Sequence, residues 1–277
     1  MIGKIYLVAT PIGNLEDITL RALKILKEVD LIAAEDTRHT LGLLNHFEIS
    51  KPLISYYKQN EKTKSDIIIK KALEGQNIAI VSDAGTPAIS DPGEEIVKQA
   101  IKNNIEIIPI PGACAFVNAL IASGFSTKEF LFVGFLSVQS KEKREKLEEI
   151  KYEKRTLILY EAPHKLKGTL EAILEILGDR KIVLARELTK IHEEFIRGSV
   201  SEIINKLEDI KGEFVILIEG GTETLEEKKI TDLNKLDLEE HYKYYENQGL
   251  EKKEIIKRIA KDKGINKNEI YQRFLNK

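Results

Sequence analysis

The feature that most constrains the fold is the stretch of residues 78–93, in which a short apolar run opens into a loop of small residues and prolines. The run at 78–81 predicts a buried strand, and residues 94–102 have the spacing of a helix. In open α/β sheets, ligands bind at loops that follow the carboxyl ends of strands. An ordinary strand-to-helix turn, with Asp91 capping the helix, explains the same residues equally well, so other parts of the chain must decide.

Two further loops of the same kind follow predicted strands. The strand at 5–9 runs into a Gly/Pro loop at 10–14, and the strand at 105–109 runs into another at 110–113. Strands that alternate with helices predict a mostly parallel sheet with crossover connections. If the three strands are neighbours, the loops at their carboxyl ends converge on one crevice.

The length of 277 residues predicts an α/β protein of more than one domain, and the character of the sequence changes after residues 124–126. Residues 1–122 predict an N-terminal α/β domain that carries the three loops, and residues 123–222 predict a second α/β domain with its own sheet. Residues 223–277 predict a linker and a basic helical domain. We expect the polar linker to run without periodicity from Gly220 to about Thr231, and three short helices to follow, the last two with helix-turn-helix spacing.

Charge bears on the possible partners. The net charge of −2 at pH 7 gives no global reason to expect a nucleic acid. Residues 249–277, however, carry nine Lys/Arg against four Asp/Glu. Such a tail is either an arm that adds contacts to an RNA backbone or a solvated appendage, and charge alone slightly favours the appendage.

Residue usage argues against several kinds of site. Cys114 is the only cysteine, so a disulfide framework and a cysteine-based zinc site are excluded. The five histidines show no i, i+4 pair, so we expect no metal. The N-terminal apolar run is too short for a signal peptide, and the apolar stretch at 113–122 is too short to span a bilayer. We therefore expect a cytoplasmic protein without membrane contact.

The composition of the loops narrows the ligand. No G-x-G-x-x-G follows a strand and no P-loop is present. Proline-rich loops offer few N–H donors, which argues against a polyphosphate. They favour a ligand held by shape, by backbone carbonyls and by a carboxylate such as Asp83. S-adenosylmethionine has these properties, because it carries no phosphate and has a cationic sulfonium and amine.

Several strings of residues resemble one known family. They lie at 8–19 with 21–23, at 32–40 and at 81–87, with shorter ones at 155–164 and 185–190. They resemble the ribosomal RNA small subunit methyltransferase I family, whose members are 16S rRNA cytidine 2'-O-methyltransferases of the tetrapyrrole methylase superfamily. The resemblance spans the chain nearly end to end. One departure lies at 111–114, where a second proline is expected after the glycine.

The resemblance implies a homodimer of two α/β domains per chain, with S-adenosylmethionine in the cleft between them. The implied substrate is a cytidine in the decoding region of 16S rRNA, within the small ribosomal subunit. It implies that the loops around Pro11, at 83–87 and at 111–115 line the cofactor. Within these loops and at the facing strand ends, we assign cofactor binding to Pro11, Gly13, Asp83, Gly85, Thr86, Pro87, Pro111, Gly112, Cys114, Ala115, Tyr160 and Ala185.

Methyl transfer to a ribose hydroxyl needs reacting atoms held in line about 3–3.5 Å apart and a base for the hydroxyl proton. The candidate bases are Glu35, Asp36, His39, Glu161, His164, Glu187 and, if its pKa is lowered, Lys190. Arg38 and Arg186 are better suited to phosphate. The residues that we assign to catalysis are Glu35, Arg38, His39, Glu161, Glu187 and Lys190.

Simpler explanations exist for these residues. Glu35 with Arg38, and Glu187 with Lys190, have the i, i+3 spacing of a helical ion pair. Two such clusters, each after a buried strand, favour a function. Two other functions stay open: a methyltransferase of the same fold acting on a tetrapyrrole or a protein side chain, and a non-catalytic RNA-binding or ribosome-assembly factor with a vestigial cleft.

Overall fold

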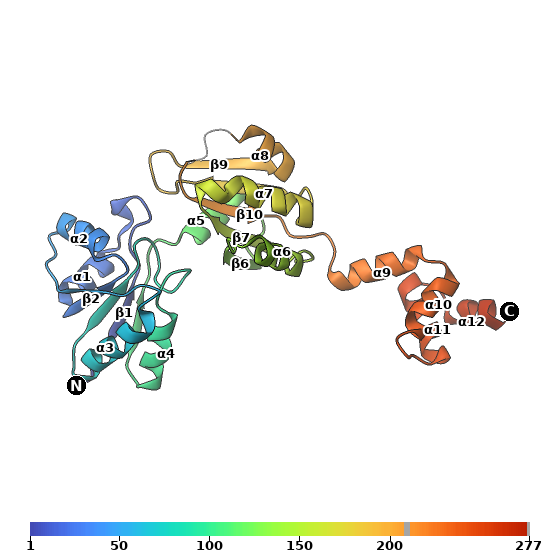
Figure 1. The fold of residues 1–277 in the computed structure, drawn as a ribbon, viewed down its shortest axis with the longest axis horizontal. Coiled ribbons are helices and arrows are strands. Elements are labelled where there is room, and N and C mark those ends of the chain that lie inside the picture. The colour runs from blue at the N-terminus through green and yellow to red at the C-terminus, as the bar shows by residue number, and fades with distance from the viewer. Residues whose placement is uncertain (208–210, 276–277) are drawn as a thin grey trace. The chain divides into compact units, whose positions relative to one another are not determined.

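The computed structural model describes residues 1–207 and 211–275 (Figure 1). The chain forms two compact units. The first unit comprises residues 1–148 and 155–219, and the second comprises residues 149–154 together with the chain from Gly220 onward. Within the described residues, no helix combines the length and the apolar character that crossing a membrane would require.

A five-stranded parallel sheet with the order β3-β2-β4-β1-β5 begins the first unit. Its strands are β1 (Ile5–Val8), β2 (Leu31–Ala34), β3 (Leu53–Ser55), β4 (Ile78–Val81) and β5 (Ile107–Ile110). The predicted parallel sheet with crossover connections is confirmed. Because β4, β1 and β5 are neighbours, the three loops of the sequence analysis leave the sheet side by side.

Helices cover both faces of this sheet. They are α1 (Leu20–Glu28) and α2 (Thr37–His46) on one face, and α3 (Glu61–Leu73) and α4 (Glu94–Lys102) on the other. Side chains alternate along a strand, so Ile78 and Ile80 pack with α3 and α4 while Ala79 and Val81 pack with α1 and α2. Burial on both faces explains why β4 is a continuous apolar run.

The second sheet of the first unit has the order β6-β7-β10-β8-β9. Its strands are β6 (Phe130–Phe135), β7 (Thr156–Glu161), β8 (Lys181–Arg186), β9 (Glu194–Ser199) and β10 (Phe214–Ile218). β6 pairs with β7 in parallel, and the other pairs run antiparallel. Helix α5 (Ala115–Ser123) packs on this sheet, where Ala119 and Leu120 share a core with Val215 and Leu217. The remaining helices are α6 (Ser140–Glu149), α7 (Pro163–Leu177) and α8 (Val200–Lys206).

The second unit is helical. It contains α9 (Leu225–Lys235), α10 (Leu238–Glu246), α11 (Lys252–Lys263) and α12 (Lys267–Leu275) around a core that includes Leu233, Tyr245, Ile256 and Ile270. The segment 149–154 belongs to this unit: the N–H of Gly221 donates to the carbonyl of Glu153 at 2.7 Å, and Lys154 pairs with Glu227 at 2.5 Å.

The linker prediction is wrong from Leu225 on, where α9 begins. Thr224 and Glu227 form a capping box, in which each side chain accepts the backbone N–H of the other residue. Leu233 is buried in the core of the helical unit and anchors the helix. The Thr-x-x-Glu pattern was present in the sequence and is the signal that predicts this start.

Candidate functional site

A cavity of about 540 Å³ opens in the first unit at the carboxyl ends of its parallel strands. Its walls come from the loops after β1, β2 and β4, the start of α5, the ends of β7 and β8, and the start of β10. This volume lies in the range of small-molecule sites, which combine apolar walls with a few polar groups. The apolar part of the wall includes Ile12, Ile89, Phe135, Leu188 and Phe214.

Hydrogen bonds join the loops that follow β1, β4 and β5. Thr10 and Gly85 exchange two backbone hydrogen bonds, of 2.9 and 3.0 Å. The hydroxyl of Thr86 donates to the carbonyl of Ala113 at 3.0 Å. The predicted convergence of the three loops is therefore confirmed. Gly85 has a φ of 83°, a left-handed conformation that favours glycine.

Three of the five acidic residues in the described lining of the cavity, Glu35, Asp83 and Asp91, influence one another electrostatically. Asp83 accepts the backbone N–H of Asp36 at 2.9 Å. Burial and the charge of Asp83 raise the pKa of Glu35. Burial and the charges of Glu35 and Asp83 raise the pKa of Asp91 to about 7, although a hydrogen bond with Ser82 offsets part of the effect. Such a cluster resists full ionisation until a cationic group arrives.

The loop that carries Asp91 has an unusual backbone. Ala88 and Ser90 have φ values of 68° and 66°, in the left-handed region that non-glycine residues rarely adopt. Each such residue costs about 1–3 kcal/mol and persists where its surroundings enforce it, which is common at ligand sites. Gly93, and not Asp91, occupies the N-cap position of α4. The carboxylate of Glu61 accepts the backbone N–H groups of Gly93 and Glu95, at 2.9 and 3.3 Å, at this end of the helix. The capping explanation for Asp91 is therefore wrong.

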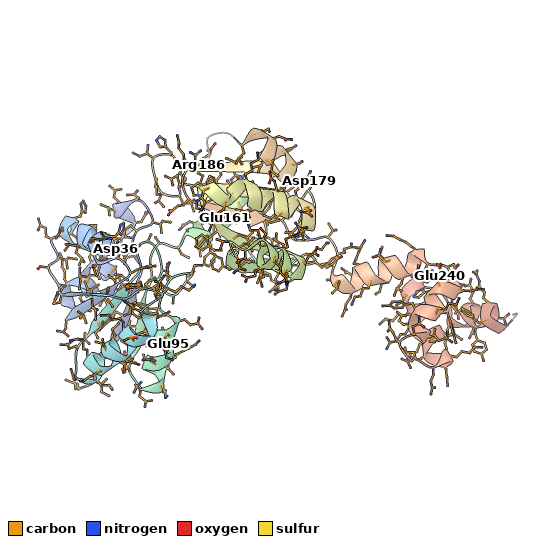
Figure 2. The ribbon with its side chains drawn as sticks, in the orientation of Figure 1. Asp36, Glu95, Glu161, Asp179, Arg186 and Glu240 are labelled. Atoms are coloured by element: carbon orange, nitrogen blue, oxygen red, sulfur yellow. The ribbon has the colours of Figure 1, made fainter. Side chains whose placement is uncertain are left out.

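Tyr160 and Glu161, at the end of β7, form part of the opposite wall. The hydroxyl of Tyr160 accepts the N–H of Phe116 at 3.2 Å, and burial raises its pKa, so the phenol stays protonated. Glu161, labelled in Figure 2, is buried and accepts the N–H of Ala162 at 2.9 Å and the hydroxyl of Thr169 at 2.6 Å. Both oxygens of this carboxylate therefore have partners within the protein.

Lys190 lines the cavity from the loop after β8. Its ammonium lies 3.0 Å from a carboxylate oxygen of Glu187 and 3.6 Å from one of Glu213. Burial alone would lower the pKa of Lys190, but the hydrogen bond to Glu187 and the charge of Glu213 outweigh it and raise the pKa. Lys190 is thus a cation, and the condition under which it would serve as a base is not met. Glu187 itself forms the expected i, i+3 ion pair and does not line the cavity.

The polar residues after β2 separate into two groups. Glu35 faces the cavity, whereas Arg38 pairs with Asp36 at 3.2 Å and is 91% exposed. The expected ion pair between Glu35 and Arg38 does not form. Asp36 and Arg186 are labelled in Figure 2, and Arg186 lies 3.5 Å from Glu194 on β9.

The cavity gathers many of the residues that sequence reasoning selected. It is lined by Glu35, Asp83, Gly85, Thr86, Cys114, Ala115, Tyr160, Glu161, His164, Ala185 and Lys190. The residues that lie outside its lining are Pro11, Gly13, Pro87, Pro111, Gly112, Arg38, His39 and Glu187. Gly13 nevertheless lies against Lys190, since a Cβ there would come within 2.5 Å of its Cγ.

Sequence reasoning missed Asp91 as a lining residue, although it is a second acid in the loop of Asp83. It also missed the apolar wall of Ile12, Phe135 and Phe214, for which the local sequence offers no signal. Burial raises the pKa of the Cys114 thiol, which disfavours the thiolate form that a nucleophile needs. In residues 1–207 and 211–275, no group of three His, Cys, Asp or Glu side chains is arranged to hold a metal ion.

Comparison with known proteins adds a second line of evidence. The sequence model of the family described as Tetrapyrrole (Corrin/Porphyrin) Methylases matches residues 4–204. Two proteins named Ribosomal RNA small subunit methyltransferase I are similar to nearly the whole chain. The one from Halalkalibacterium halodurans is 52% identical over 97% of this chain and 93% of its own. The one from Bacillus subtilis is 48% identical over 98% and 94%.

A solved structure shares the fold. It is that of uroporphyrin-III-C-methyltransferase from Thermus thermophilus, with a TM-score of 0.57 at 22% sequence identity. The similarity covers 78% of this chain and 94% of that chain.

Proposed function

This chain belongs to the ribosomal RNA small subunit methyltransferase I family of tetrapyrrole methylases, and on that premise we propose that it uses S-adenosylmethionine to methylate the 2'-hydroxyl of a cytidine in the decoding region of 16S rRNA. The proposed setting is the small ribosomal subunit in the cytoplasm. The observation that carries the proposal is the cluster of Glu35, Asp83 and Asp91, which faces a cavity with apolar side chains such as Ile12, Leu188 and Phe214 in its wall. In the described residues, no Lys or Arg forms an ion pair with these three carboxylates.

The residues of the cavity fit S-adenosylmethionine in chemistry. Carboxylates with raised pKa values suit its amine and sulfonium, since a cation removes the cost of holding like charges together. Apolar side chains such as Leu188 and Phe214 suit the flat faces of adenine. We assign Asp83, Gly85 and Tyr160 to its binding. When bound, it would supply a methyl group on a positively charged sulfur.

Two side chains of the cavity suit the acceptor hydroxyl. Glu35 has a raised pKa and faces the cavity, so it is a stronger base than an ordinary carboxylate. Lys190 keeps its charge and can stabilise negative charge that develops on the ribose oxygen. Exposed Arg38 suits a phosphate of the RNA, which guanidinium binds in bidentate fashion.

The test is methyl transfer by the purified chain. Labelled S-adenosylmethionine is incubated with small subunits, with free 16S rRNA and with a porphyrinoid, and the modified nucleotide is mapped. We expect a single 2'-O-methylated cytidine, absent with Glu35→Gln. Incorporation into the porphyrinoid, or into protein, would refute the RNA reaction in favour of another acceptor. Failure of calorimetry to detect cofactor binding would favour a non-catalytic assembly factor.

We also propose that the protein is a homodimer. Strand β6 lies at the edge of the second sheet and exposes Phe130 at 39%, and helix α5 exposes Ile121 at 69%. The two elements are neighbours, since the rings of Phe116 and Phe130 lie 6.0 Å apart. Exposed apolar side chains beside an open sheet edge invite association. Light scattering should give the mass of a dimer, and Ile121→Glu should shift it to a monomer; a monomeric wild-type chain would refute this.

A further inference from the structure

The helical unit carries a hollow of about 490 Å³ between α9, α10 and α11. Its apolar part is formed by Ile230 and Leu233 of α9 and by Tyr244 of α10. Leu233 is buried, whereas Tyr244 remains 39% exposed. An exposed aromatic ring beside apolar surface is a platform on which a planar group can stack.

Three lysines line this hollow. Lys229 reaches it from α9, and Lys257 and Lys261 reach it from α11. In the part of the chain that the structure describes, these three lysines form no ion pair, whereas the neighbouring Arg258 pairs with Glu254 at 3.8 Å. Lys257 and Lys261 are four residues apart on one helix face, where like charges cost about 0.2–0.5 kcal/mol. The hollow is also lined by Glu226, Glu254 and Asp262. Glu254 pairs with Arg258 and Asp262 accepts the hydroxyl of Tyr245, so neither acid is engaged by the three lysines.

The platform is held in place by a buried polar cluster. The hydroxyl of Tyr245 donates to Asp262 at 2.6 Å, and Nε2 of buried His241 lies 3.2 Å from the same carboxylate oxygen. The ring of Tyr244 packs edge-on against Tyr245, with centroids 5.2 Å apart and the planes at 73°. A ring fixed in this way loses little entropy when a ligand stacks on it.

We propose that this hollow binds one unstacked nucleotide of single-stranded RNA, with its base on Tyr244 and its flanking phosphates at Lys229, Lys257 and Lys261. Proteins recognise RNA chiefly where bases are splayed out, by combining aromatic stacking with cationic side chains. The inference rests on the proposed function for the identity of the RNA, which is the substrate of the first unit. It assigns the helical unit a specific binding site, beyond the diffuse attraction of a basic tail.

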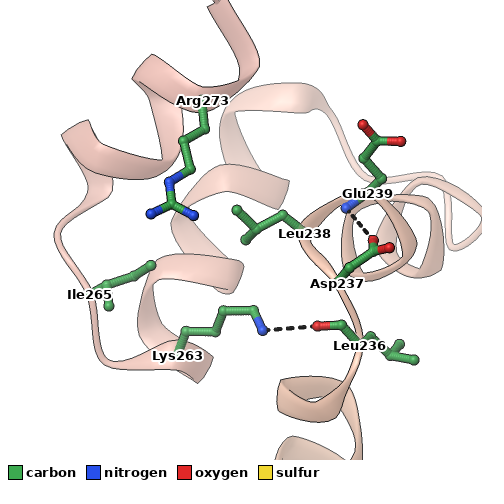
Figure 3. Close-up of a pocket in the computed structure, with 7 residues that line it drawn as sticks. All are labelled: Leu236, Asp237, Leu238, Glu239, Lys263, Ile265 and Arg273. Atoms are coloured by element: carbon green, nitrogen blue, oxygen red, sulfur yellow. Dashed lines mark hydrogen bonds between the residues drawn. The ribbon is translucent and has the colours of Figure 1, made fainter.

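A second hollow of the same unit, of about 520 Å³, makes the contrast clear (Figure 3). Its cations already have partners. Lys263 donates to the carbonyls of Asn234 and Leu236, both at 3.1 Å, and Arg273 lies 3.5 Å from Glu269. It also presents no aromatic side chain. Neither a phosphate nor a base has a ready contact there.

The experiment measures binding of the full chain to a fluorescent single-stranded RNA of about 12 nucleotides, a length within the usual site sizes. Tyr244→Ala should weaken binding about 5- to 150-fold, as the loss of one stacked base does, and Tyr244→Phe should keep most of the wild-type affinity. Lys257→Gln with Lys261→Gln should also weaken binding and reduce the slope of log K against log salt by about 1.4.

The matched control is Lys252→Gln with Lys267→Gln. It removes the same charge from α11 and α12 at exposed positions outside the hollow. We expect its loss of RNA affinity to be at least tenfold smaller than that of the variant with Lys257→Gln and Lys261→Gln. Melting curves check that each variant is folded. Equal losses of RNA affinity for the two lysine pairs would overturn the proposal. Unchanged RNA affinity for Tyr244→Ala would also overturn it and would favour a protein partner as the occupant of the hollow. This experiment measures binding and not catalysis. A wild-type chain that binds RNA through the hollow but methylates no RNA would therefore refute the proposed function without contradicting this binding site.

Discussion

Replacing Asp91 by asparagine should make the ligand-free protein more stable, and increasingly so as the pH rises. Asp91 has a pKa of about 7 in the folded protein against an ordinary value of 3.8. The folded state therefore holds this proton more tightly than the unfolded state does. The penalty for ionisation is absent below about pH 4, grows between pH 4 and 7, and is complete above pH 7. Asparagine has nearly the same shape and no such penalty.

The magnitude follows from the pKa. The difference between about 7 and 3.8 corresponds to an upper limit of about 4 kcal/mol. Asp91 is only partly buried, and solvent screening reduces the effect to about 2 kcal/mol. For a unit of this size, about 2 kcal/mol raises the melting temperature by about 4–8 °C.

Thermal unfolding at pH 5 and pH 8 measures this effect, with Asp66→Asn on the exposed face of α3 as the control for a lost surface charge. We expect the melting temperature of Asp91→Asn to exceed that of the wild type more at pH 8 than at pH 5, and Asp66→Asn to change little at either. Calorimetry should show weaker binding of S-adenosylmethionine to Asp91→Asn. A gain in stability that is the same at both pH values, or a loss, would refute the account of the carboxylate cluster.

Three further substitutions test other features. Gly93→Ala should destabilise the first unit by about 1–3 kcal/mol, because the φ of Gly93 is 148° and the new Cβ would lie 2.8 Å from the Cβ of Ala88. Unfolding in urea measures this loss, and an unchanged midpoint would contradict it. Cys114 should resist alkylation at pH 8 until the protein unfolds, since burial raises its pKa, whereas rapid labelling of the folded chain would show an accessible thiolate. Thr224→Ala should lower the stability of the helical unit by about 1 kcal/mol, because the capping box is lost. Hydrogen exchange of the α9 amides measures this effect, and protection equal to that of the wild type would show that the cap is dispensable.

The sheet strands and the converging loops could be predicted because their signals are local. The interior strands β2 and β4 are buried along their whole length and are therefore unbroken apolar runs. The loops that follow are marked by glycine and proline, and Gly85 is indeed left-handed. For the same reason, Asp83 could be placed at the cavity from sequence, two residues beyond the end of β4.

The rest of the site depends on features that no local pattern carries. Asp91 reaches the cavity because Ala88 and Ser90 turn the loop with left-handed backbones, and neither residue type announces that conformation. Phe135 and Phe214 come from a sheet formed much later in the chain, so their approach depends on packing between distant segments. Arg38 pairs with Asp36 and not with Glu35, because Asp36 is the N-cap of α2 and its carboxylate already accepts the backbone N–H of Arg38 at 2.8 Å.

The strand order of the first sheet has a consequence for biosynthesis. β1 occupies an interior position, yet both of its partners come later, β4 beginning with Ile78 opposite Ile5 and β5 beginning with Ile107. At about 5–20 residues per second, a ribosome needs about 4–15 s to deliver the first of these partners after β1 has been made. During that interval the apolar strand has no native neighbour. The nascent chain is therefore exposed to chaperones and to aggregation for seconds, and synonymous changes that slow translation between these strands should lower the yield of folded protein.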